Sequence, residues 1–395
     1  MVQSQIHRCG VSEKLYEVSG APFAFDATVL DCRAEVKGGY AVILDRTAFF
    51  PEGGGQYADT GDLGDVRVKD VQIVGDEILH YTDAPLTVGE TVHGQIDAKK
   101  RYARMQHHTG EHILSGLIHA TYGYDNVGFH LSDEEMTMDV SGPLSAEQLK
   151  ELEYAANRVV MENHAVIATY PDAETLRTLP YRSKLALTGD VRIVTIEGVD
   201  ACACCAPHVS STGQVGIIRI AESMSYKGGM RLWVVCGERA LALWHTEHAA
   251  LDAIARSFSV SRAEAVASVQ RLQKEIGELR GALGRCRREL LLGRVREAAA
   301  AGERHILLFD CGDDANIMRY AAQEGAALCE GICVLLSSPE NGVVRYVCIS
   351  DRIPLRALSK ELGAALGGRG GGSDRMIQGS VTDDADAIRA FFAGV

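Results

Sequence analysis

Two pairs of metal-binding residue types recur in this sequence at a spacing of four. The first pair is His108 and His112 in His-Thr-Gly-Glu-His, within a segment whose apolar periodicity predicts a helix. On a helix this spacing puts both imidazoles on one face, about a turn apart. The second pair is Cys204 and His208 in Cys-Cys-Ala-Pro-His. Thiolate and imidazole are both good zinc ligands, so the four side chains predict one Zn²⁺ per chain.

The spacing leaves the role of this metal open. A closed tetrahedral set of four protein ligands is the structural pattern, whereas a catalytic zinc keeps a position for water or substrate. Cys202 and Cys205 offer competing thiolates beside Cys204. Buried cysteines without a metal are also common, because a free cysteine behaves as a small hydrophobic residue.

The histidine pair has a second interpretation. His-Thr-Gly-Glu-His matches the H-x-x-E-H pattern of inverted zincin metalloproteases, in which Glu111 would be the general base and a distant glutamate the third ligand. This reading leaves Cys204 and His208 unexplained. The sequence has no G-x-S-x-G motif, which disfavours acyl transfer through serine. A cysteine nucleophile at Cys202 or Cys205 is a further alternative.

A glycine-rich segment lies upstream of both pairs. It runs from Thr47 through Ala-Phe-Phe-Pro-Glu-Gly-Gly-Gly to Gln56 and follows a β-branched run. Three glycines permit a tight turn or a close approach of the backbone to a neighbour. A simple hairpin connection is the alternative.

The elements that must position these residues change along the chain, and together they predict an α+β protein. Residues 1–95 contain β-branched runs between Gly-rich turns, which predicts a small β-barrel-like domain. Residues 96–240 mix strands with helices at 97–122 and 145–162, which predicts a two-layer α/β domain. Ser145 and Gln148 can form a capping box at the start of the second helix.

The remaining residues predict a helical connector at 241–300 and a C-terminal α/β domain at 301–395. In the connector, apolar residues spaced three and four apart form a heptad seam that predicts a coiled coil, as an intramolecular hairpin with a helix near 240–257 or as a dimer. The glycine-rich segment 367–379 is either a linker or a loop whose backbone approaches another group closely. The seam residues are Val269, Leu272, Ile276, Leu279, Leu283, Cys286 and Leu290.

Length and composition limit the class of protein. A chain of 395 residues with 46% hydrophobic and 24% charged residues is globular, and its length favours two to three domains. No apolar run is long enough to span a membrane and no secretory leader is visible, so we expect a cytoplasmic protein whose 11 cysteines stay reduced. The net charge is −13, yet residues 249–300 hold ten basic and six acidic side chains, a local charge of +4.

Three segments, taken in order, resemble a known family. Thr-Ala-Phe-Phe-Pro-Glu-Gly-Gly-Gly-Gln, His-His-Thr-Gly-Glu-His-Ile-Leu-Ser-Gly and Cys-Cys-Ala-Pro-His resemble the editing domain of alanyl-tRNA synthetases and, more closely, the free-standing AlaX-type editing proteins. The later glycine-rich stretch is similar to the DHH-associated domain at the end of those synthetases. The resemblance covers nearly the whole chain and leaves no room for the synthetase's catalytic domain, so it indicates the long AlaX form.

The resemblance implies an ATP-independent trans-editing hydrolase that uses zinc and cleaves the ester of mischarged alanine tRNA, with serine or glycine as the wrong amino acid. The family commonly has Cys-Gly-Gly-Thr-His, and Pro207 in this chain restricts the Cys-to-His geometry. The implied zinc ligands are His108, His112, Cys204 and His208, the implied catalytic residues are His108, His112 and Gln56, and the implied substrate contacts are Thr47, for the serine hydroxyl, and Gln56.

The C-terminal part then gains a role in holding tRNA(Ala). A basic cluster on the connector helix supplies phosphate contacts, although such a cluster also occurs on an ordinary solvated helix face. We expect mischarged tRNA(Ala) as the partner, no membrane, and a homodimer through the C-terminal region. The alternative function is a tRNA-binding module whose zinc is purely structural. The predicted nucleic-acid contacts are Arg285, Arg287, Arg288, Arg369, Gly370 and Gly371.

Overall fold

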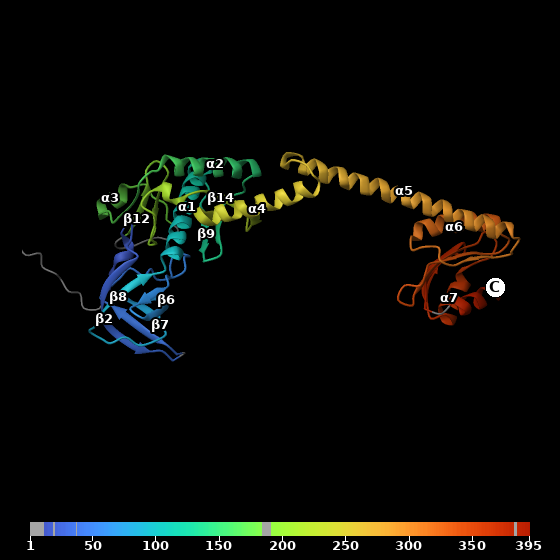
Figure 1. Ribbon diagram of the computed structural model, residues 1–395, viewed down its shortest axis with the longest axis horizontal. Helices are drawn as coiled ribbons and strands as arrows, with labels where there is room; N and C mark the ends of the chain where they lie inside the picture. The colour runs from blue at the N-terminus through green and yellow to red at the C-terminus, as the bar shows by residue number, and fades with distance from the viewer. Residues whose placement is uncertain (1–11, 19, 37, 184–190, 383–384) are drawn as a thin grey trace, which may run out of the picture. The chain divides into compact units, whose positions relative to one another are not determined.

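A computed structural model describes residues 12–18, 20–36, 38–183, 191–382 and 385–395 (Figure 1). It is a mixed α/β structure with several sheets, as the sequence predicts. The chain divides into two compact units, Met1–Ala250 and Leu251–Val395, and each is described by itself. No helix among the described residues is both long and apolar enough to cross a membrane.

The first unit begins with six strands that hydrogen-bond in the closed order β2-β3-β7-β6-β5-β8. Their side chains alternate between a buried interior and the surface, as in β8, where every second residue is buried. The β-branched runs between Gly-rich turns that the sequence predicts here include β6, which pairs antiparallel with its neighbours β5 and β7. The bounds are Ala24–Ala34 (β2), Tyr40–Leu44 (β3), Gly61–Leu63 (β5), Val66–Val74 (β6), Glu77–Thr82 (β7) and Thr91–Ile96 (β8).

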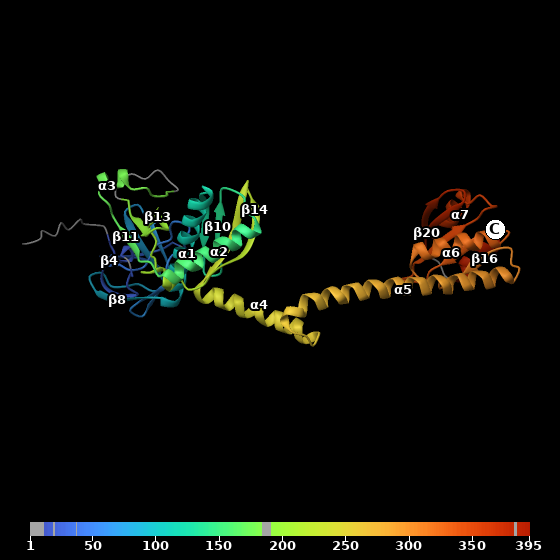
Figure 2. The ribbon, with the colours of Figure 1, turned by 90° about the horizontal axis from the view of Figure 1, so that it is seen from above.

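Two long helices pack with a four-stranded sheet in the order β14-β15-β10-β9 (Figure 2). Helices α1 (Ala98–Tyr122) and α2 (Ala146–Glu162) confirm the two helices expected there, and the capping box of Ser145 and Gln148 is formed. Their apolar faces share one core with the sheet. The strands are Asn126–Leu131 (β9), Met136–Val140 (β10), Ile218–Tyr226 (β14) and Gly229–Cys236 (β15).

Helix α1 is anchored to the strand-rich part by a buried ion pair. The Arg101 guanidinium donates to the Asp59 carboxylate and to the Ala48 carbonyl, and both charged side chains are almost fully buried. The same carboxylate accepts the Phe50 N–H at 2.7 Å. Because breaking a buried pair leaves an uncompensated charge, this contact fixes α1 against the strands firmly.

A three-stranded sheet, in the order β11-β12-β13, completes the first unit. The other elements of the first unit are short strands and helices and the longer helix α4, whose last residues are assigned to the second unit. Their bounds are Glu13–Lys14 (β1), Arg46–Thr47 (β4), Val166–Thr169 (β11), Ile193–Ile196 (β12), Asp200–Ala203 (β13), Ala173–Thr178 (α3) and Gly237–Ser257 (α4), with 3-10 turns at Leu15–Glu17, Thr212–Val215 and Arg262–Glu264.

The second unit contains a long helix and a five-stranded sheet in the order β16-β17-β18-β20-β19. Helix α5 (Ala265–Ala300) follows a capping box formed by Ser261 and Glu264, and its last turns share a core with α6 (Figures 1 and 2). Pairing of its heptad seam remains a prediction. The other elements are Ala315–Leu328 (α6), Arg356–Ala365 (α7), Ala385–Ala393 (α8), Ile306–Leu308 (β16), Cys333–Leu336 (β17), Val344–Ile349 (β18), Arg369–Gly372 (β19) and Met376–Val381 (β20).

The glycine-rich segment in this unit is neither a linker nor a loop. Its glycines form the edge strand β19, which pairs with β20. A Cβ atom on Gly370 would lie 2.2 Å from the Tyr346 Oη, whereas one on Gly371 would meet nothing within 4 Å. Close backbone approach is therefore the reason for glycine at position 370, and it is a contact within the sheet.

Candidate metal centre

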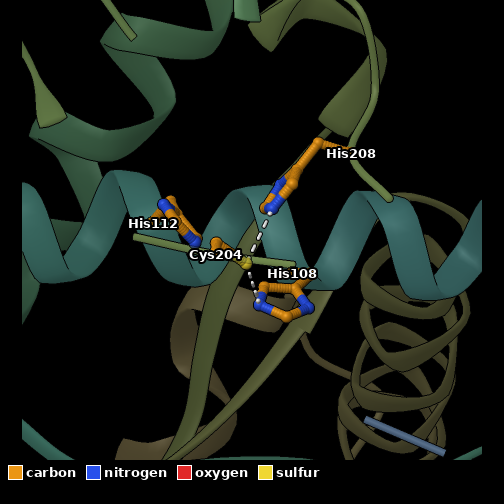
Figure 3. A group of neighbouring side chains, drawn as sticks. All are labelled: His108, His112, Cys204 and His208. Carbon is orange, nitrogen blue, oxygen red and sulfur yellow. Dashed lines mark hydrogen bonds between the residues drawn. The ribbon is translucent and has the colours of Figure 1, made fainter. Parts of the chain in front are cut away.

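The four predicted ligands come together at the centre of the first unit (Figure 3). His108 and His112 point from one face of α1, while Cys204 and His208 come from the segment that follows β13. One ligand atom of each residue lies within 4.8 Å of the others. The three histidines are buried and Cys204 is half-buried, so this is an enclosed cluster.

The spacing of these atoms fits a zinc ion. The Cys204 Sγ lies 3.5 Å from His108 Nε2 and 3.3 Å from His208 Nε2. In a tetrahedral site with Zn–N near 2.1 Å and Zn–S near 2.3 Å, a nitrogen and a sulfur ligand are separated by about 3.5 Å. The donor set of three imidazoles and one thiolate is also one that zinc accepts.

A second layer of side chains orients the three imidazoles. His108 Nδ1 lies 2.8 Å from Gln56 Oε1, and His112 Nδ1 lies 2.9 Å from Asp200 Oδ2. His208 Nδ1 lies 3.0 Å from the Thr109 hydroxyl. Since every Nδ1 has an oxygen partner, each Nε2 is left for a metal, which is the usual arrangement around protein zinc.

Electrostatics favour Cys204 over its neighbour as the thiolate ligand. Burial alone would raise the pKa of the Cys204 thiol, but the imidazoles of His108 and His208 hold it well below its ordinary value. Burial raises the pKa of Cys202, although its sulfur forms a second possible metal group with His112 and Asp200. Because the thiolate binds metal, Cys204 is the better ligand.

Glu111, the general base of the protease interpretation, is buried. Its Oε1 accepts hydrogen bonds from the Ser115 hydroxyl and the Asn126 amide, and its Oε2 lies 3.9 Å from His112 Nε2. The sequence shows that Glu111 directly precedes the ligand His112, but it does not show that Asn126 on β9 donates to Glu111. The metal groups among the described residues contain no glutamate, which disfavours the H-x-x-E-H protease interpretation.

Three of the four cluster residues, His108, His112 and Cys204, line a cavity of about 990 Å³. Polar and charged side chains from several elements share this wall, and Asp200 holds one of them, Arg182, through two hydrogen bonds of 2.8 and 2.9 Å. Aromatic rings contribute the apolar part. Lining residues include His108, His112, Cys204, Glu111, Asn126, Phe129, Tyr170, Tyr181, Arg182 and Arg192.

The two predicted substrate contacts lie behind this wall and are fully buried. Gln56 supports His108, and its Nε2 has no hydrogen-bond partner among the described residues. The Thr47 hydroxyl lies 2.8 Å from His80 Nε2 and accepts the Phe49 N–H. Neither Thr47 nor Gln56 belongs to the described cavity lining, and a role for either in substrate contact stays a prediction.

The backbone of the glycine-rich segment before Gln56 packs closely against β9. Gly55 has a φ of +85°, and a Cβ there would lie 2.3 Å from the Phe129 carbonyl oxygen. Its own carbonyl accepts the Leu131 N–H at 2.7 Å. This confirms the close approach that the three glycines predict, and it docks the segment against β9.

The predicted nucleic-acid residues all lie in the second unit, away from the metal ligands in sequence. Arg285 and Arg287 are exposed on α5, and Arg288 is half-buried, 5.3 Å from the ring centre of Tyr320. Arg369, Gly370 and Gly371 are exposed on β19. The structure therefore places these six residues on two elements of one unit.

Two family patterns match the first unit. Residues 24–100 match "tRNA synthetases class II (A)", and residues 191–232 match "Threonyl and Alanyl tRNA synthetase second additional domain". The second match contains Cys204 and His208, and the first contains Gln56.

Curated relatives cover most of the chain. An alanine–tRNA ligase of Methanopyrus kandleri is 31% identical over 95% of this chain and 44% of its own length, and one of Pyrococcus furiosus is 32% identical over 88% and 40%. The chain thus spans less than half the length of these ligases. The mouse alanyl-tRNA editing protein Aarsd1 is 26% identical over 92% of this chain and 90% of its own length. The chain is a relative of the AlaX-type alanyl-tRNA editing proteins and of the archaeal alanine–tRNA ligases.

Proposed function

We propose that this protein is a zinc-dependent trans-editing deacylase that hydrolyses the ester of seryl-tRNA(Ala), with glycyl-tRNA(Ala) as the second candidate substrate. The observation that carries the proposal is the cluster of three histidines and one cysteine, of which His108, His112 and Cys204 line a cavity of about 990 Å³. Its supporting comparison is with relatives named for alanyl-tRNA editing.

The cavity has the components that such a substrate needs. An aminoacyl ester sits on the terminal ribose of a single-stranded RNA end, and aromatic rings such as Phe129, Tyr170 and Tyr181 offer stacking surfaces for its bases. Arg182 adds a positive charge. These groups line the same cavity as His108, His112 and Cys204, so the ester end of a bound tRNA would lie near the metal ligands.

Zinc held by the four ligands would supply Lewis-acid polarisation or orientation of the reacting ester. The chain's own residues would set the geometry around it. Gln56, Thr109 and Asp200 fix the imidazoles through their Nδ1 atoms, and Glu111, held by Ser115 and Asn126, contributes a carboxylate beside His112. Under this proposal His108 and His112 take part in catalysis as ligands, and Gln56 acts by positioning His108.

Chemistry also explains why serine and glycine are the expected errors. A synthetase pocket for alanine cannot exclude the smaller glycine well, and an added hydroxyl is only weakly rejected. A second site that bonds the serine hydroxyl can remove seryl esters selectively.

We further propose that the second unit holds the body of the tRNA. Arg285 and Arg287 are exposed and surrounded by a net positive segment, which suits phosphate contact. Replacing both with alanine should raise the apparent KM for tRNA and flatten its salt dependence while leaving kcat unchanged. Unaltered kinetics would remove these residues from tRNA binding.

The decisive experiment is deacylation of one tRNA(Ala) charged separately with serine, glycine and alanine. With zinc-loaded protein we expect loss of the seryl or glycyl ester and retention of the alanyl ester. His208→Ala should abolish the activity, whereas His93→Ala, at an exposed histidine outside the described cavity lining, should retain it. Persistence of all three esters with zinc bound and tRNA retained would favour a structural-zinc binding module.

A further inference from the structure

Arg192 is a buried cation whose partners within the described chain are all neutral. Among the described residues three arginines are buried, and two of them, Arg101 and Arg104, form ion pairs with aspartates. Arg192 is 6% exposed, and each hydrogen bond that it makes goes to a backbone carbonyl. Because a buried charge without an opposite charge is costly, this guanidinium is a place where an anion would be stabilised.

The hydrogen bonds of Arg192 leave one end of its guanidinium without a partner. Nε donates to the Glu17 carbonyl at 2.9 Å, and Nη1 donates to the carbonyls of Cys204 and Ala206 at 2.7 and 2.9 Å. Nη2 is buried and has no hydrogen-bond partner among the described residues. Since buried polar groups in proteins are nearly always hydrogen-bonded, this nitrogen indicates an acceptor that binds beside it.

Arg192 lines the same cavity as the metal ligands, and a second cation lies near it. Lys14 also lines this cavity, and its Nζ lies 3.6 Å from the carboxylate of Glu17, the residue whose carbonyl Arg192 holds. The other carboxylates of the described lining, Glu111 and Asp125, have hydrogen-bond partners elsewhere. Around Glu17 two cations thus stand against one carboxylate, an excess that favours an anionic ligand.

The position of Arg192 next to a metal ligand indicates which anion it suits. Because Nη1 holds the carbonyl of Cys204, the guanidinium adjoins the backbone that carries the cluster's thiolate. In an aminoacylated nucleotide a single ribose separates the ester oxygen from the 5′-phosphate. An ester at the metal cluster therefore brings that phosphate within reach of Arg192, and a guanidinium is well matched to phosphate oxygens.

We propose that Arg192 and Lys14 form an anion subsite of this cavity, which binds the 5′-phosphate of the nucleotide that carries the ester. The identity of the nucleotide rests on the proposed function, whereas the anion site rests on the contacts of Arg192 alone. Phosphate contacts position a nucleic acid and carry no base information directly. The subsite therefore serves any aminoacylated 3′ end and leaves the choice of tRNA to other surfaces.

The test compares the binding of adenosine 5′-phosphate and of adenosine to the full zinc-loaded chain by isothermal titration calorimetry. We expect the 5′-phosphate to bind at least about tenfold more tightly, as hydrogen bonds to charged groups allow. Lys14→Met should reduce this preference by about two- to fivefold, the usual effect of an exposed charge. The matched control is Lys69→Met, because Lys69 is an exposed lysine 3.9 Å from the Asp83 carboxylate and outside the described cavity lining.

Two substitutions of Arg192 separate its charge from its geometry. Arg192→Met should abolish the phosphate preference, and Arg192→Lys, which keeps the charge but loses the planar fork, should retain part of it. Zinc content is measured on the same samples, because Arg192 also holds the Cys204 carbonyl. If Arg192→Met loses its zinc, Lys14→Met and Arg192→Lys decide the question.

The outcomes distinguish the subsite from the proposed function. Equal affinity for adenosine and its 5′-phosphate, or a preference that Lys14→Met and Arg192→Lys leave intact, would overturn the subsite even if seryl-tRNA(Ala) is hydrolysed. Inorganic phosphate that binds as tightly as the nucleotide would overturn the assignment to a nucleotide. A phosphate preference that falls in both variants, without hydrolysis of any ester, would support the subsite and contradict only the proposed function.

Discussion

Replacing Asp200 with asparagine should weaken zinc binding without removing a zinc ligand. Asp200 accepts three hydrogen bonds, one from His112 and two from Arg182, and its side chain is 2% exposed. The hydrogen bond to His112 holds the ring so that Nε2 faces the other ligands. Loss of an outer partner of this kind costs about 10–100-fold in metal affinity, or about 1.4–2.8 kcal/mol.

This magnitude agrees with the bond that is lost. A hydrogen bond to a charged group contributes about 1.5–3 kcal/mol, and burial puts this one toward the upper part of that range. In Asp200→Asn, Arg182 also loses its charged partner, so part of the cost will appear as reduced stability of the metal-free protein. Zinc affinity must therefore be measured separately from unfolding.

The assay is zinc competition against a chromophoric chelator, with thermal unfolding of the metal-free protein as a parallel measurement. Asp125→Asn is the matched control, because Asp125 Oδ1 also lies 2.9 Å from a histidine Nδ1, that of His119, but the pair is exposed and outside the ligand set. We expect weaker zinc binding only in Asp200→Asn. Equal zinc affinity in wild type and Asp200→Asn would refute the view that Asp200 orients His112.

Three further predictions follow from buried contacts. Burial lowers the pKa of His80 from 6.5 to about 4, so the folded chain holds this imidazole neutral. The free energy of unfolding, measured with urea, should therefore fall by up to about 3 kcal/mol as the pH drops from 6.5 to 4. A His80→Gln variant should lose this pH dependence. Thr47→Val removes the hydroxyl that pairs with His80 Nε2, so it should lower the free energy of unfolding by about 1–3 kcal/mol and leave the zinc content unchanged. Thr47→Ser keeps a hydroxyl and should lower it less. Equal stability of the two variants would contradict this. Gly370→Ala should destabilise the second unit by about 1–3 kcal/mol through its clash with Tyr346, and Gly371→Ala should not; thermal scans that rank them the other way would argue against the β19 contact.

The sequence predicts best what depends on neighbouring residues. Helices α1 and α2 were expected at nearly their observed bounds because periodicity and caps are local signals. The same holds for the two ligand pairs, since spacing four on a helix or a turn is local. We inferred from ligand chemistry that the two pairs meet. In the structure one ligand atom of each of the four residues lies within 4.8 Å of the others.

The outer partners of the imidazoles could not be predicted as such. Asp200 belongs to no motif, and Thr109 lies inside the His-Thr-Gly-Glu-His segment without a predicted role. Their contacts with the imidazoles form only when α1 packs against β13 and the segment that follows it. Gln56 was named from the resemblance, but its contact with His108 is a tertiary one. The strand β19 was missed because glycine has low strand propensity, and its pairing with β20 compensates for that.

The metal centre can also be viewed as a removable cross-link. Its ligands His108 and Cys204 are 96 positions apart in the chain, so an ion held between them would close a long loop. Unlike a disulfide, such an ion would leave when the chain unfolds, so it would stabilise the folded state by mass action, with the logarithm of the free zinc concentration. Chelation should therefore accelerate amide exchange in α1 and around β13 together, making this part of the fold respond to zinc supply.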